Sequence, residues 1–105
     1  MILELADIRI QPGTQSTFEK AAKKGLDSVL AKAEGFISYE IQKCIESPLR
    51  YVLLIQWENL EAHTVGFRTS PAHGEWRAIV GPFFAQAPFV EHFSLISVHK
   101  ESLID

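Results

Sequence analysis

The sequence predicts a single α+β domain with the element order strand, helix, strand, strand, helix, strand. Short segments separated by Pro, Gly and Ser switch between the two-residue hydrophobic period of strands and the longer period of helices. The 105 residues suit one domain spanning 1–105, because a chain of this length has no room for a second core.

The first two segments predict a strand followed by an amphipathic helix. Residues 2–10 are rich in Ile and Leu and end at a Pro-Gly turn, which is typical of a strand. The helix should begin near residues 14–16, where Ser16 and Glu19 have the spacing of a capping box, and Gly35 is placed to end it. Its apolar face consists of Phe18, Ala21, Ala22, Gly25, Leu26, Val29, Leu30 and Ala33.

The next two segments predict a β-hairpin. Residues 36–46 form its first strand, and a turn containing Ser47-Pro48 leads to a second strand over 51–58. The first of these strands alternates, with one side formed by Ile37, Tyr39, Ile41 and Ile45.

The last part of the chain predicts two helical segments and a final strand. Asn59 can cap a short helix over residues 60–68. Ser70-Pro71 has the cap and first-turn residues of a second helix, which should continue to the next Gly-Pro turn. Residues 88–98 form the last strand.

This element order is that of the ferredoxin-like sandwich, in which two helices cover one face of a four-stranded antiparallel sheet. Both sides of the third strand are nevertheless apolar, because Val52 and Leu54 alternate with Leu53 and Ile55. The last strand shows the same two-sided pattern. An uncovered apolar face of this size is uncommon in monomers, so we expect a homodimer with its sheets face to face. The alternative is that some of these strands lie at edges or under the C-terminal tail.

Composition limits the partners and the compartment. The net charge is −3 and the pI about 5.8, which predicts neither a nucleic-acid nor a membrane partner. The single cysteine, Cys44, excludes an intramolecular disulfide and a cysteine-based zinc cage. The sequence has neither an apolar run of membrane-spanning length nor a signal-peptide pattern, so we expect a cytoplasmic protein.

Three histidines and one arginine are the main candidates for chemistry. His63 lies on the apolar face of its helix, so it must hydrogen-bond inside the fold or face a cavity. His73 falls on the apolar side of the second helix, Arg77 follows one turn later, and His92 lies on the last strand. The alternatives are core or interface histidines and a surface ion pair for the arginine.

The histidines come from separate elements without a short-spaced pair, so no metal site is expected. Aromatic residues are concentrated in the second half of the chain. They indicate a core, an aromatic-walled pocket between helices and sheet for a flat organic ligand, or both. They are Trp57, Phe67, Trp76, Phe83, Phe84, Phe89 and Phe93.

Several short motifs together resemble the antibiotic biosynthesis monooxygenase (ABM) domain family. They are Gln56-Trp57-Glu58-Asn59, His63, Phe67-Arg68-Thr69-Ser70, Trp76-Arg77, Gly81-Pro82-Phe83-Phe84 and Val90-Glu91-His92-Phe93. The resemblance extends over about residues 2–98 and implies a dimeric α/β barrel with a pocket in each protomer. The best-understood members are cofactor-free monooxygenases that convert polycyclic phenols to quinones, so the resemblance implies that no cofactor is needed.

The resemblance also implies residue roles. Trp57 and Arg77 stand where those monooxygenases have a pocket tryptophan and arginine, and His63 takes the place of a pocket tyrosine. Leu53 stands where they have an asparagine, so one polar contact to the substrate is missing. The haem-degrading branch has a histidine as iron ligand at the position of Arg77, which argues against haem.

These observations predict a cofactor-independent monooxygenase that oxidises an aromatic or phenolic, quinol-type small molecule with O₂. His63 would be the general base, and Arg77 would hold the developing anion. The expected substrate-binding residues are Trp57, Phe67, Trp76, His73, Leu53, Phe83 and His92. Two alternatives are a non-catalytic small-molecule-binding dimer and an isomerase or lyase that uses the same histidine on a carbonyl compound.

Overall fold

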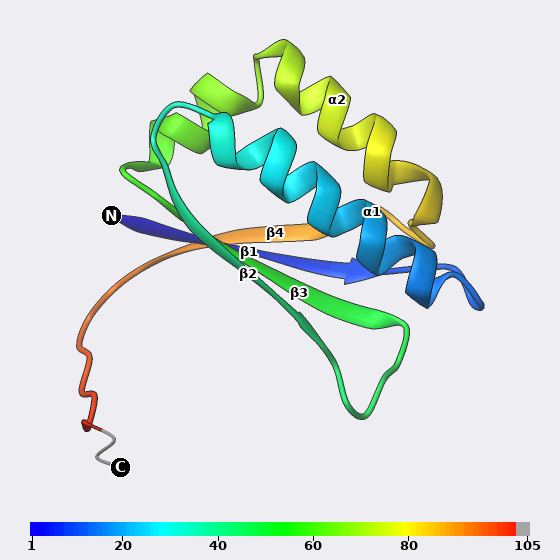
Figure 1. Ribbon diagram of the computed structural model, residues 1–105. Coiled ribbons are helices and arrows are strands. Elements are labelled where there is room, and N and C mark those ends of the chain that lie inside the picture. Colours follow the sequence, from blue (N-terminus) through cyan, green and yellow to red (C-terminus); the bar gives the residue numbers. More distant parts are fainter. Residues whose placement is uncertain (103–105) are drawn as a thin grey trace.

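The computed structural model describes residues 1–102 and contains the predicted order of elements (Figure 1). The strands are β1 (Ile2–Arg9), β2 (Phe36–Lys43), β3 (Arg50–Trp57) and β4 (Phe89–Ser94). The long helices are α1 (Gln15–Ser28) and α2 (Pro71–Val80). Shorter helical turns are η1 (Leu30–Lys32), η2 (Ala62–Phe67) and η3 (Gly81–Phe83). The α+β, ferredoxin-like fold is therefore confirmed.

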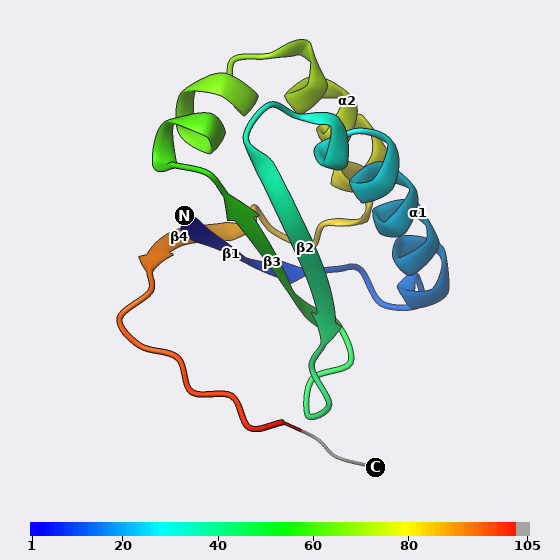
Figure 2. The same cartoon turned by 60° about the vertical axis from the view of Figure 1, so that its left-hand side comes forward.

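The four strands form one antiparallel sheet in the order β2-β3-β1-β4. Helices α1 and α2 lie side by side on one face of this sheet, and no helix of residues 1–102 covers the other face (Figures 1 and 2). The central strands β1 and β3 alternate between the two faces. Ala6 of β1 pairs with Leu53 of β3 and Val90 of β4, and Glu4 pairs in the same way with Ile55 and His92.

The core lies between the sheet and the helices. The strands contribute Ala6, Ile8, Tyr51, Leu53, Ile55 and Trp57, and Ile10 follows directly after β1; all of these residues are buried. The two helices approach each other closely at Gly25, where a Cβ atom would lie 2.9 Å from the ring of Trp76. A glycine at this position therefore allows Trp76 to pack under α1 while it remains on the sheet side of α2.

Two predictions for the first half of the chain were wrong in detail. The N-cap of α1 is Thr14, without a side-chain cap bond, so Ser16 and Glu19 do not form a capping box. The Glu19 carboxylate instead accepts hydrogen bonds from Tyr51 (2.6 Å) and Lys43 (3.2 Å). In β2, an irregularity between Phe36 and Ser38 moves Ile37 out of the alternating pattern.

The open face of the sheet carries the predicted apolar side chains on β1, β3 and β4, together with charged ones at Asp7, Glu40 and Glu91. Phe89 and Phe93 of β4 are 63% and 45% exposed on it. Beside Phe93, a groove of about 340 Å³ runs along the start of β1. Strand β4 ends at Ser94, four residues before the predicted end, and residues 95–102 leave the sheet as an extended segment (Figure 2). Leu95, Ile96 and Val98 are consequently exposed rather than paired on a strand.

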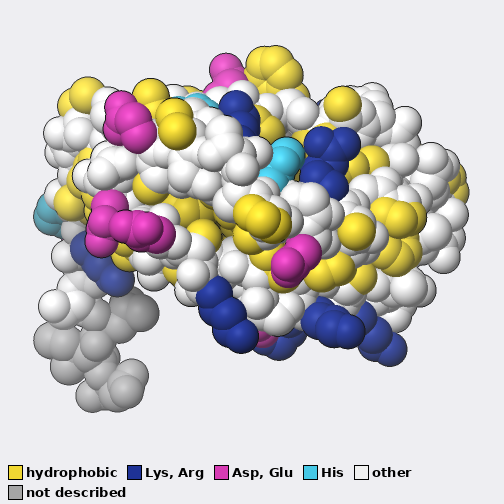
Figure 3. All heavy atoms as spheres, turned by 90° about the horizontal axis from the view of Figure 1, so that it is seen from above, with side chains coloured by type: hydrophobic (Ala, Val, Ile, Leu, Met, Phe, Trp, Pro, Cys, Tyr) yellow, Lys and Arg dark blue, Asp and Glu magenta, His cyan; other side chains and the backbone are white. Residues whose placement is uncertain are grey.

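On the helix side, acidic, basic and hydrophobic side chains are interspersed rather than gathered by charge (Figure 3). Within residues 1–102, none of the helices has the length and hydrophobicity needed to span a bilayer.

Candidate functional site

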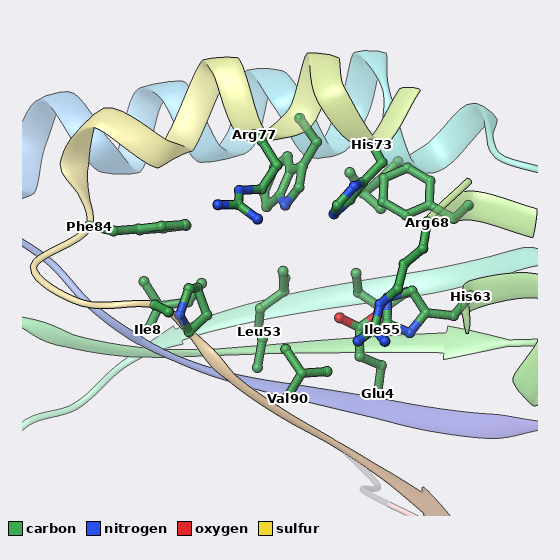
Figure 4. Close-up of a pocket in the computed structure, with 16 residues that line it drawn as sticks. Glu4, Ile8, Leu53, Ile55, His63, Arg68, His73, Arg77, Phe84 and Val90 are labelled. Carbon is green, nitrogen blue, oxygen red and sulfur yellow. The ribbon is translucent and has the colours of Figure 1, made fainter. Parts of the chain in front are cut away.

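A cavity of about 270 Å³ lies between the helices and the covered face of the sheet (Figure 4). Arg77 and His73 reach it from α2, while Leu53, Val90 and Glu4 reach it from the strands below. The full lining is Glu4, Ala6, Ile8, Leu30, Leu53, Ile55, His63, Phe67, Arg68, His73, Trp76, Arg77, Phe84, Ala87, Pro88 and Val90. The cavity is thus mainly apolar, with its polar groups concentrated at Glu4, His63, His73 and the two arginines.

Glu4 is a buried carboxyl group in the covered face of β1. Its side chain points to the same side as Ala6 and Ile8, and the residue is 6% exposed. The Trp57 indole N–H donates a 2.9 Å hydrogen bond to Glu4 Oε1. Sequence reasoning missed Glu4, although a charged residue in step with Ala6, Ile8 and Ile10 was a usable signal, because a buried charge needs partners.

The segment η2 brings His63 to the pocket. Asn59 caps the helical residues that begin at 60 and continue into η2, since its side-chain oxygen accepts a 2.8 Å hydrogen bond from the Ala62 N–H, as predicted. The turn itself is π-helical rather than α-helical, and the Arg68 N–H bonds to the His63 carbonyl at 3.1 Å. This wider turn places the side chains of His63, Phe67 and Arg68 around the cavity, in the way that π-turns often accompany functional sites.

Both ring nitrogens of His63 have polar neighbours. Its Nε2 lies 3.3 Å from Glu4 Oε1, and its Nδ1 shares a 2.8 Å hydrogen bond with Nε2 of His92. One face of the ring stacks on Trp57 at 5.3 Å between centroids, and the residue is 5% exposed. The structure therefore joins Glu4, His63 and His92 into one continuous polar chain on the covered face.

The surroundings of Glu4, His63 and His92 disfavour the charged form of each side chain. Burial raises the pKa of Glu4, while the Trp57 hydrogen bond and the charge of Arg68 act in the opposite direction. Burial lowers the pKa of His63 to about 4, and the nearby Arg68, His92 and His73 add to that effect. The pKa of His92 is also lowered, first by burial and then by Arg68. At neutral pH the imidazole of His63 is therefore unprotonated and available to accept a proton.

The structure brings most of the predicted site residues to one cavity. His63, Arg77, Phe67, Trp76, His73 and Leu53 all line it. His73 stands edge-on to Phe67, at 5.5 Å between ring centroids, and burial lowers its pKa, with further contributions from Arg77 and Arg68. Within residues 1–102, neither Arg77 nor Arg68 forms an ion pair, so both guanidinium groups can bind an anion.

Three predicted substrate-binding residues do not line the cavity. Trp57 is fully buried beneath His63, where its indole N–H donates a hydrogen bond to Glu4. Phe83 packs against Phe18 at 5.9 Å, and the neighbouring Phe84 reaches the cavity instead, because η3 turns the two side chains apart. His92 lies behind His63 as its hydrogen-bond partner.

Arg68 and Glu4 are the lining residues with polar side chains that sequence reasoning did not assign. Arg68 belongs to a motif quoted for the family resemblance, but its role depends on the π-turn, which no sequence pattern predicted. Among the described residues, no group of three His, Cys, Asp or Glu side chains is arranged to hold a metal ion.

Comparison with known proteins identifies the family. The family model for antibiotic biosynthesis monooxygenases matches residues 1–79, so the chain belongs to this family. An uncharacterized protein of Bacillus subtilis strain 168, YczJ, is 38% identical over 93 residues, which cover 89% of this chain and 97% of YczJ.

Solved structures agree with the fold. A candidate antibiotic biosynthesis monooxygenase from Bordetella bronchiseptica is 35% identical, with a TM-score of 0.86 over 91% of this chain and 97% of the other. A monooxygenase from Streptomyces coelicolor, crystallised with nanaomycin D, is 20% identical, with a TM-score of 0.81 over 96% of this chain and 92% of its own. At that identity, the second likeness supports the fold alone.

Proposed function

We propose that the protein is a cofactor-independent monooxygenase that oxidises an aromatic or phenolic, quinol-type small molecule with O₂. The observation that carries the proposal is the single cavity that contains His63, Arg77 and an aromatic wall. Membership of the monooxygenase family supports it. Apart from Glu4, the residues that close the cavity on the sheet side are apolar, which suits a flat organic substrate.

In this proposal, His63 accepts a proton from the substrate and Arg77 binds the resulting anion. The ionised aromatic then gives electrons to O₂ and forms a carbon–oxygen bond. The peroxide so formed takes back a proton and loses water, which leaves a carbonyl group on the ring. For an anthrone-type substrate, a CH₂ group and O₂ thus yield C=O and H₂O. The protein contributes deprotonation, a dry pocket and stabilisation of the anion.

The test is oxygen uptake by metal-stripped protein with a panel of anthrone- and quinol-type substrates, compared with the uncatalysed rate. We expect catalysed uptake, and we expect His63→Ala to lower the rate by roughly 10²- to 10⁴-fold. A matched control is His99→Ala, because the His99 side chain is 85% exposed and lies outside the cavity. Tight binding without turnover would instead support a binding module. Turnover that is indifferent to oxygen would support an isomerase or lyase.

The open face of the sheet supports a second part of the proposal, a homodimer. Phe89 and Phe93 are exposed there, and the apolar residues Leu95, Ile96 and Val98 extend beyond the sheet, which together is typical of an interaction surface. A second copy packed on the open face would cover these residues and leave the cavity on the other face free. Sedimentation at micromolar concentration tests this, and a monomer would contradict it.

A further inference from the structure

Given the proposed function, we propose that His63 and His92 form a two-imidazole relay that carries the substrate proton out of the cavity. In the same proposal, Glu4 positions His63 for this transfer. His92 then has a role that its sequence position did not suggest: it takes the proton from His63 rather than contacting the substrate.

The polar chain runs from the cavity towards solvent. Glu4 and His63 line the cavity and are 6% and 5% exposed. His92 does not line the cavity and is only half-buried, on the edge strand β4. The 2.8 Å contact between His63 Nδ1 and His92 Nε2 is a short hydrogen bond, and the two ring centroids are 5.0 Å apart. A proton can therefore cross from the buried imidazole to the more exposed one without a water between them.

The sheet register explains why these groups meet. Glu4 and His92 are paired neighbours on β1 and β4, so both side chains rise from the same face of the sheet. The π-turn of η2 lowers His63 onto this pair from the helical layer. Three elements far apart in the sequence thus hold Glu4, His63 and His92 in place, and the geometry of these residues does not depend on an exposed loop.

The transfer is balanced in protons and electrons. In the resting state, His63 carries its proton on Nδ1, donates it to His92 Nε2, and keeps a free electron pair on Nε2. The substrate O–H or C–H bond breaks, its electron pair stays on the substrate anion beside Arg77, and its proton binds His63 Nε2. The Nδ1 proton of His63 passes to His92 Nε2, and the Nδ1 proton of His92 passes to water. At this stage one proton has moved from substrate to solvent, and both imidazoles carry their proton on Nε2. The peroxide then takes its proton from His63 Nε2, His63 Nδ1 recovers a proton from His92 Nε2, and His92 Nδ1 recovers one from water, which restores the resting state.

Glu4 offsets the charge of the intermediate imidazolium. The groups around His63 are Glu4 from β1, His92 from β4, Arg68 after η2 and His73 from α2. All of them except Glu4 are neutral or positive, so they disfavour a protonated His63. The carboxyl at 3.3 Å from Nε2 opposes this effect, as in other sites where an acidic group orients and supports a histidine base. Trp57 fixes the carboxyl in turn through its 2.9 Å hydrogen bond.

The first experiment is a comparison of His92→Gln with wild type in oxygen-uptake assays. The glutamine amide can retain a hydrogen bond to His63 but cannot accept and release a proton. We expect kcat to fall by roughly 10²-fold with KM unchanged, and added imidazole to restore much of the rate. His99→Gln, a histidine outside the chain of contacts, is the matched control. A wild-type kcat in His92→Gln would overturn the relay.

The second experiment tests Glu4 through Glu4→Gln, which is nearly the same shape but carries no charge. We expect a lower plateau for kcat, with the acidic limb of its pH profile moved to lower pH, because the imidazole has lost its negative neighbour. A merely structural role would lower kcat equally at all pH values. That result would overturn the positioning role of Glu4.

The third experiment needs no activity. Long-range ¹⁵N–¹H correlation spectra of the wild-type protein report which nitrogen of each imidazole carries the proton. The relay requires His63 protonated on Nδ1 and His92 unprotonated on Nε2. His63 protonated on Nε2 would overturn the relay. Because this readout is independent of turnover, it separates failure of the relay from failure of the proposed oxygenase activity, which would show as no oxygen uptake by wild type.

Discussion

The two faces of the sheet carry opposite kinds of surface. The face beneath the helices is buried and apolar but contains an acid, two histidines and access to a cavity. The open face exposes apolar residues such as Phe89 and Phe93, and one of its acidic residues, Asp7, forms ion pairs with Arg9 and Arg50. Burial shifts the pKa values of the ionisable groups beneath the helices, and we propose that the open face serves assembly.

Two phenylalanines offer the sharpest stability test of this difference. Phe18 of α1 is fully buried against Tyr51 and Phe83, whereas Phe89 of β4 is 63% exposed on the open face. We expect Phe18→Ala to lower the free energy of unfolding by about 3–5 kcal/mol, because it leaves a cavity in the core. Phe89→Ala should change the unfolding of the isolated protomer far less. Urea denaturation of both variants at low protein concentration measures this, and equal losses would contradict the comparison.

A charge on the open face should affect assembly rather than folding. Phe93→Glu places a carboxylate in the proposed dimer interface, where burying it without a partner is costly. We expect a weakening of dimerisation of about 10²-fold or more, with far-UV circular dichroism and oxygen uptake by the protomer retained. Sedimentation velocity over a concentration series gives the dissociation constant. A variant that remains dimeric at wild-type concentrations would place the interface elsewhere.

Two glycines test how closely the covered side is packed near the site. Gly35 and Gly13 both have positive φ, +83° and +80°, so alanine strains either backbone. At Gly35 the new Cβ would also meet Ala62 Cβ at 2.6 Å, whereas at Gly13 no atom of the described residues would lie within 4 Å of it. We expect Gly13→Ala to destabilise the fold by about 1 kcal/mol and Gly35→Ala by more. Because Ala62 begins η2, only Gly35→Ala should also disturb His63. Thermal unfolding measures the stability of both variants, and oxygen uptake shows whether only Gly35→Ala also loses activity.

The pH dependence of stability separates Glu4 from His63. The pKa of His63 falls from 6.5 in the unfolded chain to about 4 in the fold. Between these pH values the unfolded chain binds more protons, so His63 makes stability decrease as pH falls from 6.5 towards 4. The raised pKa of Glu4 acts in the opposite sense, because above the ordinary glutamate pKa of 4.5 the folded chain holds the proton more tightly than the unfolded chain does.

Removing each group should therefore change the acid sensitivity in opposite directions. We expect His63→Gln to lose less stability than wild type between pH 6.5 and 4, and Glu4→Gln to lose more. Urea midpoints measured across this range give both slopes. Identical slopes in the two variants would show that these groups do not titrate differently in the folded and unfolded states.

Sequence patterns predicted the fold because they reflect burial. The helical spacing from Phe18 to Leu26 and the alternation along β3 are both seen as buried residues. His63 was found for the same reason, as a polar residue on an apolar helical face. Glu4 was missed because it lies in a strand rich in Ile and Leu and its partners come from β3, η2 and β4. Such long-range partners leave no spacing in the sequence, and neither does the π-turn that directs Arg68.

The proposal that the covered face binds the ligand and the open face serves assembly can be tested directly by mapping where a ligand binds. Methyl-group NMR shifts are recorded during titration with a hydroxyanthraquinone, an inert analogue of the proposed quinone product. We expect shifts at Ala6, Leu53, Ile55 and Val90, which line the cavity beneath the helices. Shifts centred on Leu3, Leu5 and Leu95, which line the groove of the open face, would contradict it.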